Sequence, residues 1–382
     1  MKVTLKNSIK NDRYTEYVYD KFDIQNREET EVNINFSLGE AKNFDWNIGI
    51  IYGSSGSGKT TILKQMGQLS KSEFDLDKSL ISNFDWLEPE DASRLLSSMG
   101  LSSVPTWLRP FHLLSNGEQF RAELAYKIGK AKDNEVVLID EFTSVVDRDV
   151  AKSMSFAIQK YIRKNNKRMV VASCHYDIME WLTPDWVSSP QKNGGALERS
   201  PLLRGSRPNI ELQVSRVESN TWDLFKEHHY LTEKANKSCK FLLFTWNNKP
   251  VGMVAVINQP RKGCPNGFAL SRTVVLPDFQ GLGLGVKLSE YSAAMFKDMG
   301  GKIYTKTIHP ALGVHRNKSD NWRGTTFNGK ISQHAKYDKS AKARLERVSY
   351  CHEYVGEPIS GYSDILKPIK EMRDNNKLKL EL

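Results

Sequence analysis

A glycine-rich run early in the chain has the composition of a phosphate-binding loop. The run comprises Gly53, Ser54, Ser55, Gly56, Ser57, Gly58, Lys59 and Thr60. It fits the pattern G-x-x-x-x-G-K-[ST] and lies between a predicted strand over residues 48–52 and a predicted helix over residues 60–70. Backbone N–H groups of such a loop surround a phosphate, and the amino terminus of the helix adds a favourable dipole. We therefore expect bound ATP, with Lys59 on the β- and γ-phosphates and the Thr60 hydroxyl on Mg²⁺.

Two acidic residues at the end of another apolar stretch could complete this site. Asp140 and Glu141 close a predicted buried strand over residues 135–140. Asp140 can hold Mg²⁺ through water, and Glu141 can polarise the water molecule that attacks the terminal phosphate. A third predicted strand, residues 168–173, precedes His175. The alternation of strands and helices predicts a layered α/β domain.

These motifs, in this order, resemble those of the ABC ATPase family. Residues 114–119, Leu-Ser-Asn-Gly-Glu-Gln, resemble its signature motif and precede a predicted helix over residues 120–130. Residues 142–147 resemble its D-loop, and His175 its switch histidine. The resemblance implies that the signature of one copy closes on the ATP of another, and hence an ATP-dependent homodimer. The signature residues implied to contact that nucleotide are Ser115, Gly117 and Glu118.

The same resemblance implies further parts of the nucleotide site. The family stacks adenine on an aromatic residue upstream of the glycine run, for which Trp46, Phe44 and Phe22 are candidates. The short stretch between the glycine run and the signature predicts a small helical subdomain. It contains no glutamine that we can assign to the Q-loop.

A second glycine turn lies in the back half of the chain. It follows a predicted strand over residues 272–276 and precedes an amphipathic helix predicted over residues 285–299. The turn resembles motif A of the GNAT acetyltransferases, [QR]-x-x-G-x-[GA], which implies binding of acetyl-CoA or a related acyl-CoA. Exposed backbone N–H groups there would hold the pyrophosphate, while residues 271–275 pair with the pantetheine arm. The alternative is a domain that has lost its cofactor. The residues implied to bind are Val274, Val275, Gln280, Gly281, Leu282, Gly283, Leu284 and Gly285.

Short motifs around this turn resemble the Mom-like branch, phage proteins that use a GNAT fold to modify DNA bases. They are residues 227–231, 306–311 and 317–322. By this resemblance His229 and Tyr230 form part of the active site, with Asp320 as a further catalytic candidate. Two alternatives stay open. The His-Tyr pair could pack a helix against the sheet, and Asp320 could cap a turn.

The basic charge of the chain is concentrated in its back half. Residues 301–350 hold eleven Lys or Arg against three Asp or Glu, whereas residues 1–200 are slightly acidic. A local basic excess is typical of a polyanion-binding surface, DNA above all, although a solvated lysine-rich face is the alternative. Basic side chains would track phosphates and aromatic ones would stack on an unpaired base. The residues expected to contact nucleic acid are Arg316, Lys318, Trp322 and Arg323, with Lys336, Lys342, Arg344, Phe327 and Tyr337 nearby.

Length and composition limit how the chain can be divided into domains. A chain of 382 residues favours two domains, and a Gly-, Pro- and Ser-rich linker over residues 188–208 places the boundary near residue 205. We expect a P-loop ABC-type α/β domain over 1–205 and a mixed α/β GNAT-fold domain with a basic extension over 206–382. No apolar run is long enough to span a membrane, no signal peptide is apparent, and four scattered cysteines show no pairing pattern. These features favour the cytoplasm, that of a bacterial host if the protein is phage-encoded.

The sequence favours a DNA-modifying acyltransferase that an ATPase domain loads or gates on DNA. Two alternatives remain. One is an ATP-dependent N-acetyltransferase for a protein or a small molecule. The other is a non-catalytic DNA-binding ATPase in which the GNAT fold acts as a clamp.

Overall fold

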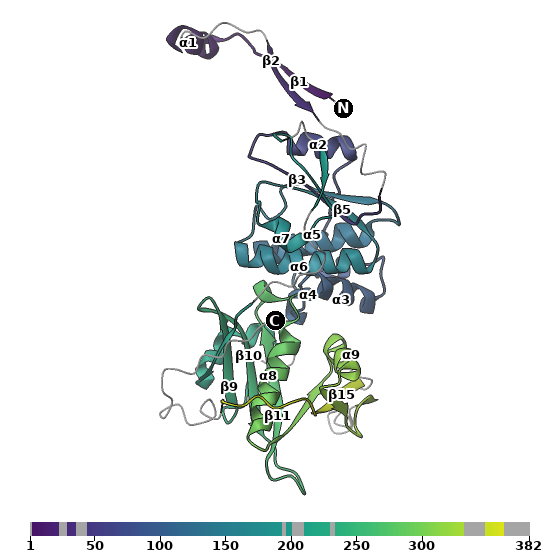
Figure 1. Ribbon diagram of the computed structural model, residues 1–382, viewed down its shortest axis with the longest axis vertical. Helices are drawn as coiled ribbons and strands as arrows, with labels where there is room; N and C mark the ends of the chain where they lie inside the picture. Colours follow the sequence, from purple (N-terminus) through teal and green to yellow (C-terminus); the bar gives the residue numbers. More distant parts are fainter. Residues whose placement is uncertain are drawn as a thin grey trace. The chain divides into compact units, whose positions relative to one another are not determined.

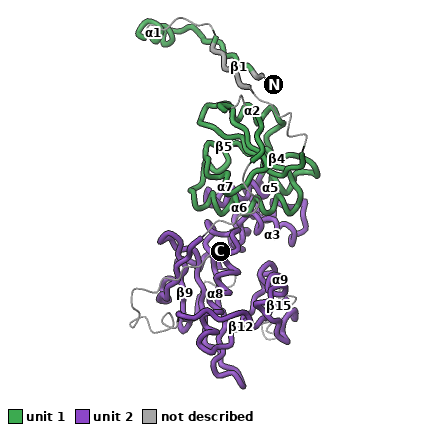
Figure 2. The backbone as a smooth tube through the Cα atoms, viewed as in Figure 1, with its two compact units in different colours: residues 1–73, 126–206 green, residues 74–125, 207–382 purple. Residues whose placement is uncertain are grey.

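A computed structural model describes residues 2–22, 29–35, 44–192, 196–200, 210–229, 234–331 and 348–362. Contacts divide the chain into two compact units (Figure 2). Unit 1 comprises residues 1–73 and 126–206, and unit 2 comprises residues 74–125 and 207–382. The contact pattern thus places the segment 74–125, which includes the signature motif, with the back half of the chain. No described helix is both long and apolar enough to cross a membrane.

Unit 1 contains a five-stranded sheet in the order β4-β5-β3-β6-β7, preceded by a separate two-stranded sheet (Figure 1). The predicted strands at 48–52, 135–140 and 168–173 are present as β3, β4 and β5. β3 through β6 are parallel, and only β7 is antiparallel to its neighbour. The strands are β1 (Lys2–Ser8), β2 (Glu29–Asn35), β3 (Ile48–Tyr52), β4 (Val136–Ile139), β5 (Arg168–Ser173), β6 (Trp186–Ser188) and β7 (Leu197–Arg199).

The helices of unit 1 are α1 (Arg13–Phe22), α2 (Lys59–Met66), α6 (Arg148–Lys164) and α7 (Ile178–Leu182). α2 ends earlier than the predicted helix because Gly67 interrupts it. Ile62 and Leu63 of α2 pack against Ile51, Val170 and other apolar strand residues in one core cluster. Burial of each such side chain contributes about 1.5–3 kcal/mol. This packing fixes the helix that follows the glycine run against the sheet.

Unit 2 begins with a helical segment. Its elements are η2 (Ile81–Asn83), α3 (Pro89–Ser98), α4 (Val104–Trp107), η3 (Phe111–Leu113) and α5 (Asn116–Lys130). The last five residues of α5 belong to unit 1. α5 starts within the signature motif, four residues before the predicted helix, because Ser115 and Glu118 form its cap. The stretch between the glycine run and the signature, expected to be a small helical subdomain, does contain helices, and its contacts group it with unit 2.

An eight-stranded mixed sheet forms the rest of unit 2, in the order β13-β15-β12-β11-β10-β9-β8 with β14 on β15. Only β11 and β12 are parallel. β9 and β10 form a hairpin whose two loop residues, Asn247 and Asn248, both have positive φ, as a two-residue type I′ turn requires. The strands are β8 (Gln213–Val217), β9 (Lys240–Trp246), β10 (Lys249–Asn258), β11 (Gly267–Val275), β12 (Lys302–Thr307), β13 (Trp322–Gly324), β14 (Lys330–Ile331) and β15 (Val348–Tyr354).

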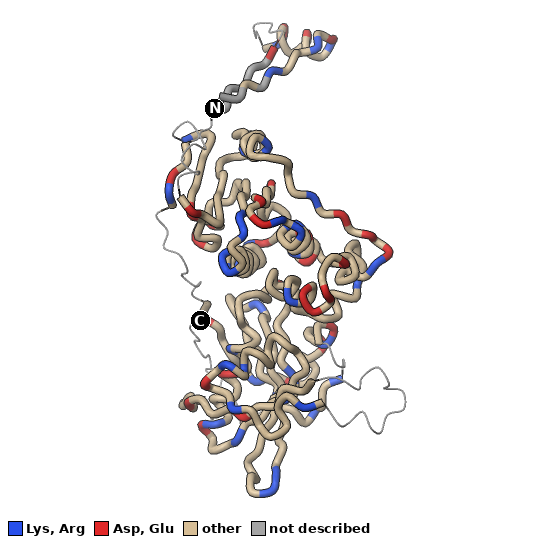
Figure 3. The backbone as a smooth tube through the Cα atoms, turned by 90° about the vertical axis from the view of Figure 1, so that its right-hand side faces the viewer, with Lys and Arg blue, Asp and Glu red and all other residues tan. Residues whose placement is uncertain are grey.

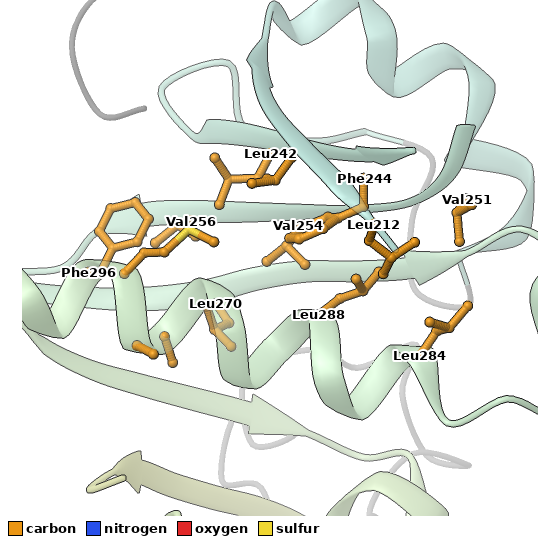
Figure 4. Packing of buried hydrophobic residues seen from close by; sticks show 14 of the residues in the cluster. Leu212, Leu242, Phe244, Val251, Val254, Val256, Leu270, Leu284, Leu288 and Phe296 are labelled. Carbon is orange, nitrogen blue, oxygen red and sulfur yellow. The ribbon is translucent and has the colours of Figure 1, made fainter. Parts of the chain in front are cut away.

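Helix α8 (Leu284–Asp298) packs on this sheet (Figure 4). Leu284, Leu288 and Phe296 meet strand residues such as Val254 in the main core cluster of unit 2. The other helical elements of the unit are η5 (Ser219–Leu224), η6 (Lys226–His228), η7 (Pro277–Phe279) and α9 (Pro310–Lys318). The packing of α8 fixes the turn 280–283 between β11 and the helix. All four cysteines lie in described ranges and are free thiols, as the sequence predicts.

Candidate functional site

Three predicted parts of the nucleotide site follow neighbouring parallel strands of unit 1. The glycine run follows β3, Asp140 and Glu141 follow β4, and His175 follows β5. β5 pairs with both β3 and β4, and the carboxyl ends of parallel strands meet at the same edge of a sheet. The fold therefore brings these residues to one edge. Ligands of open α/β sheets bind at this edge.

The glycine run has the backbone of a phosphate-binding loop. Gly56 and Gly58 have φ of +76° and +92°, which residues with a side chain rarely adopt, and Gly58 caps α2. A Cβ at Gly53 would come within 2.7 Å of the Ser57 hydroxyl. The Lys59 ammonium donates to the carbonyls of Gly53 at 2.9 Å and Ser54 at 2.6 Å. The loop thus places one cation beside N–H groups at the start of a helix, an arrangement suited to phosphate.

A glutamine beyond β6 also contacts this loop. The Gln191 amide donates to the Ser54 hydroxyl at 2.9 Å, and its oxygen accepts from the Ser54 N–H at 3.3 Å. Sequence reasoning missed Gln191 because it lies within the expected linker, 137 residues from Ser54. The contact depends on the pairing of β6 with β3.

The backbone just after Asp140 has positive φ at two residues, and one of them, Thr143, contacts the histidine. Glu141 and Thr143 have φ of +49° and +69°, and the Glu141 side chain is exposed. The Thr143 hydroxyl lies 3.2 Å from Nδ1 of His175. Asp147, at the end of the predicted D-loop, caps α6 by accepting from the N–H groups of Asp149 and Val150. The strained backbone at Glu141 holds its carboxylate at the sheet edge, where a catalytic carboxylate is expected.

The aromatic candidates for adenine stacking lie in three different settings. Trp46 is buried and meets Trp186 edge-on at 5.6 Å, so it is a core residue and the expectation is wrong for it. Phe44 is half-buried beneath the Arg199 guanidinium, 4.5 Å from its ring centre. Phe22 is exposed on α1.

The signature residues cap α5. Oε2 of Glu118 accepts from the Ser115 N–H at 3.0 Å and from its hydroxyl at 3.1 Å, while Oε1 accepts from Thr106 at 3.1 Å. This is a capping box, and it leaves Glu118 only 5% exposed. The expectation that Glu118 contacts nucleotide is therefore corrected: its carboxylate is turned inward. Ser115 remains exposed at the start of the helix, and Gly117 is half-buried there.

The second glycine turn also precedes a helix. Gly281 and Gly283 have φ of +91° and +79°, and Gly283 caps α8. Leu282 is half-buried, Leu284 is part of the core, and Gly285 lies in the first helical turn. The Gly283 carbonyl accepts from the N–H groups of Val286 and Lys287. The N–H groups ahead of these two, at the very start of a helix, have no partner within the helix, as an anion site requires.

The strand before this turn separates from its parallel neighbour. β11 pairs with β12 only from Gly267–Lys302 to Leu270–Thr305, although β11 continues to Val275. A β-bulge lies there, because Ala255 pairs with Arg272 and Val256 with Leu270, leaving Ser271 as the extra residue. Among the described residues, 271–275 have no strand partner on the β12 side. The backbone of Val274 and Val275 can therefore pair with an extended ligand, as expected for the pantetheine arm.

Gln280 supports the turn with its side chain. Its Nε2 donates to the Val275 carbonyl at 2.9 Å, and its Oε1 accepts from the Ser102 N–H at 2.5 Å. The side chain is buried, so a contribution of Gln280 to ligand binding comes from its backbone.

The expected acceptor side is only partly described. His229 is 7% exposed and meets Trp222 edge-on at 5.8 Å, which fits the packing alternative. Tyr230 lies outside the described residues. Asp320 is exposed in the turn between α9 and β13. The neighbouring His228 was not singled out in the sequence. Burial lowers its pKa, and the nearby Glu118 carboxylate opposes that shift.

The expected nucleic-acid residues do not form one surface. Arg316 is 2% exposed; it donates to the Thr305 hydroxyl at 2.9 Å and stacks over Trp322, itself 5% exposed. Arg316 and Trp322 are thus an interior pair, which corrects the expectation that they contact DNA. Lys318 is exposed, and Arg323 is exposed but hydrogen-bonded at 2.9 Å to Glu353, which raises its pKa. Lys336, Tyr337, Lys342 and Arg344 lie outside the described residues, and Phe327 is exposed.

Comparison with known proteins identifies the second domain. Residues 209–317 match the acetyltransferase (GNAT) family. Among solved structures, the dimeric post-hydrolysis state of the ATP-binding cassette MJ0796 is 16% identical, with a TM-score of 0.33 over 48% of this chain and 95% of that one. The IAA acetyltransferase from Bacillus cereus is 12% identical, with a TM-score of 0.29 over 37% of this chain and 98% of that one. The ribosomal-protein-S18-alanine N-acetyltransferase from Escherichia coli is 14% identical, with a TM-score of 0.29 over 40% of this chain and 97% of that one. No curated protein matches the sequence.

The chain therefore combines an α/β domain whose ordered motifs resemble those of ABC ATPases with a domain that matches the GNAT acetyltransferase family over residues 209–317. The first assignment rests on the ordered motifs and the parallel sheet that gathers them, and the second on the family match. Neither the family match nor the fold carries the more specific resemblance to Mom-like proteins.

Proposed function

We propose that the protein is an acyltransferase that moves an acyl group from acyl-CoA to an amine of a DNA base, under the control of its ATPase domain. The observation that supports acyl-CoA most directly is the separation of β11 from β12 beside the glycine turn of α8. A separated strand offers backbone hydrogen bonds to an extended arm, and the turn offers N–H groups to a pyrophosphate.

The bound thioester supplies an activated acyl carbonyl. The acceptor amine forms a C–N bond to that carbon, the C–S bond breaks, and the amine proton passes to a base while the thiolate accepts a proton. Backbone N–H groups of 271–275 would polarise the carbonyl. On the resemblance of this segment to the Mom-like proteins, His229 and Tyr230 are the proposed proton-transfer pair, since imidazole and phenol groups can both accept and donate a proton.

The choice of DNA rests on charge. Lys302, Lys306, Lys318 and Lys330 are exposed in the basic part of the GNAT domain. Figure 3 marks the Lys and Arg positions of the described chain in blue along the backbone. Exposed lysines attract a polyanion. The acceptor base would have to leave the helical stack to reach the acyl group. There are two alternatives to a DNA acceptor. The acyl group could go to a protein or a small molecule, or the GNAT fold could serve as a non-catalytic clamp on DNA.

The test is mass spectrometry of nucleosides from DNA incubated with the protein, acetyl-CoA and Mg-ATP. We expect an acetylated nucleoside that forms only when DNA, protein and acetyl-CoA are all present. At high protein concentration it should form without ATP as well. A matched reaction with protein substrates separates the alternatives. If acetylated peptides form and no modified nucleoside does, the acceptor is protein and not DNA. If the protein binds acetyl-CoA but forms neither product, the non-catalytic clamp is favoured.

Replacing Lys306, Lys318 and Lys330 together by Ala is expected to weaken DNA binding and to flatten its salt dependence. The slope of log affinity against log salt should fall by about 0.9 for each phosphate that the variant no longer neutralises. Fluorescence anisotropy of a labelled duplex across a salt series measures this slope. Arg316→Ala is the contrasting variant, because removal of the buried guanidinium should lower thermal stability instead of the slope. An unchanged slope in the triple variant would show that DNA binds to another surface or does not bind to the protein.

The proposed ATP-dependent dimer follows from the exposed Ser115 at the start of α5 and the resemblance to ABC ATPases. Glu141→Gln should retain ATP but stop hydrolysis, since the amide cannot polarise the attacking water. The trapped complex should then accumulate as a dimer in sedimentation velocity with Mg-ATP. Ser115→Arg in the same background is expected to abolish the dimer, and a Glu141→Gln protein that stays monomeric would contradict closure by a second copy.

A further inference from the structure

The segment that carries the signature motif contacts the acyl-CoA turn inside unit 2. The Ser102 N–H donates to Oε1 of Gln280 at 2.5 Å. Nη1 of Arg121, in α5, donates to the Pro277 carbonyl and lies 3.4 Å from the Gly100 carbonyl. Residues far apart in the sequence thus meet at the strand-to-helix turn that is proposed to hold pyrophosphate.

The fit at this contact is tight. Arg121 is completely buried. Gly100, just after α3, has a φ of +86°, and a Cβ built there would lie 3.1 Å from the Gln280 carbonyl oxygen and 3.6 Å from Cδ of Arg121. Real Cβ atoms seldom approach a backbone oxygen so closely, so only glycine fits without displacing the turn.

The contact fixes the turn from two sides. Gln280 joins the turn to the end of β11 through the Val275 carbonyl and to the helical segment through Ser102. Arg121 holds Pro277, at the start of η7, which leads into the turn. N–H groups that bind a phosphate must be aimed in advance, and small errors of position cost large factors in binding.

We propose that the signature-bearing segment 74–125 positions the acyl-CoA phosphate turn, with Gly100 and Arg121 as positioning residues for acyl-CoA. This inference rests on the proposed acyl-CoA binding. It gives the helical segment a second role besides that of the signature: it completes the cofactor site of the acetyltransferase domain.

The chain contains a matched pair of glycines that tests the proposal. Gly100 and Gly300 each follow a methionine that caps a helix, and their φ values are +86° and +75°. A Cβ at Gly300 would meet nothing within 4 Å, whereas one at Gly100 would press on the turn. Gly100→Ala and Gly300→Ala therefore carry similar backbone strain, but only the new methyl group of Gly100→Ala presses on the turn at Gln280.

Calorimetric titration with coenzyme A is the measurement. Gly100→Ala should bind about tenfold more weakly than wild type, and Gly300→Ala within about twofold. Hydrogen exchange at the amides of residues 280–285 should be faster only in Gly100→Ala. Should that variant not fold, Arg121→Met replaces it, with Arg316→Met as the equally buried control and Arg121→Lys expected to recover part of the affinity.

The outcomes separate two failures. If wild type binds coenzyme A and both glycine variants bind equally well, the positioning role is overturned while the acyl-CoA site stands. If wild type does not bind coenzyme A, the proposed function fails and the positioning role fails with it.

Discussion

Lys59→Ala should lower ATP turnover by about a hundredfold or more, an effect comparable to the loss of a preorganised transition-state donor. The lysine is the only cationic side chain in the run 53–60. Its ammonium already lies against the loop, 2.9 Å from the Gly53 carbonyl and 2.6 Å from that of Ser54. Removing it leaves the negative charge of the phosphates without a side-chain counterion in the loop.

The measurement is phosphate release at saturating Mg-ATP, together with binding of a fluorescent ATP analogue. Lys64→Ala is the matched control, because Lys64 is an exposed lysine on the same helix, α2. It should hydrolyse ATP at the wild-type rate. Full turnover by Lys59→Ala would mean that the glycine run does not hold the nucleotide. Acetyl-CoA binding by the same protein should be unchanged and reports that the chain is folded.

Local motifs allowed much of this architecture to be predicted from the sequence. The glycine run, the acidic pair and the turn at Gly283 depend on residues close together in the chain, so backbone requirements appear directly as residue types. The turn at Asn247 and Asn248 has a local signal of the same kind, because asparagine tolerates the positive φ that both residues adopt. Even the inward carboxylate of Glu118 has a local signal, since Ser115 and Glu118 are spaced as in a capping box.

Features that depend on distant packing could not be predicted in this way. Arg316 looks like a phosphate contact in the sequence, but α9 places its guanidinium over Trp322, in the interior. Gln191 contacts Ser54 only because β6 pairs with β3. The contact between Ser102 and Gln280 joins residues 178 positions apart. No spacing rule connects such pairs, because the fold brings them together.

Gly283→Val should weaken coenzyme A binding by about a hundredfold, which corresponds to roughly 2.7 kcal/mol. The residue caps α8 with a φ of +79°, so any side chain is strained there by about 1–2 kcal/mol, and a β-branched one most of all. A Cβ at Gly283 meets nothing within 4 Å of the protein. The added isopropyl group would therefore occupy the open space before the helix, where the pyrophosphate is expected.

Strain alone must be separated from this steric block. Gly263, in the hairpin between β10 and β11, has a φ of +74° and equally open surroundings. Gly263→Val carries the same backbone penalty away from the turn, so its coenzyme A affinity should stay within about twofold of wild type. Titration calorimetry with coenzyme A and thermal unfolding of both variants measure the two effects, and ATP turnover should persist in each. Equal affinities for coenzyme A in Gly283→Val and wild type would show that the pyrophosphate does not bind at this turn.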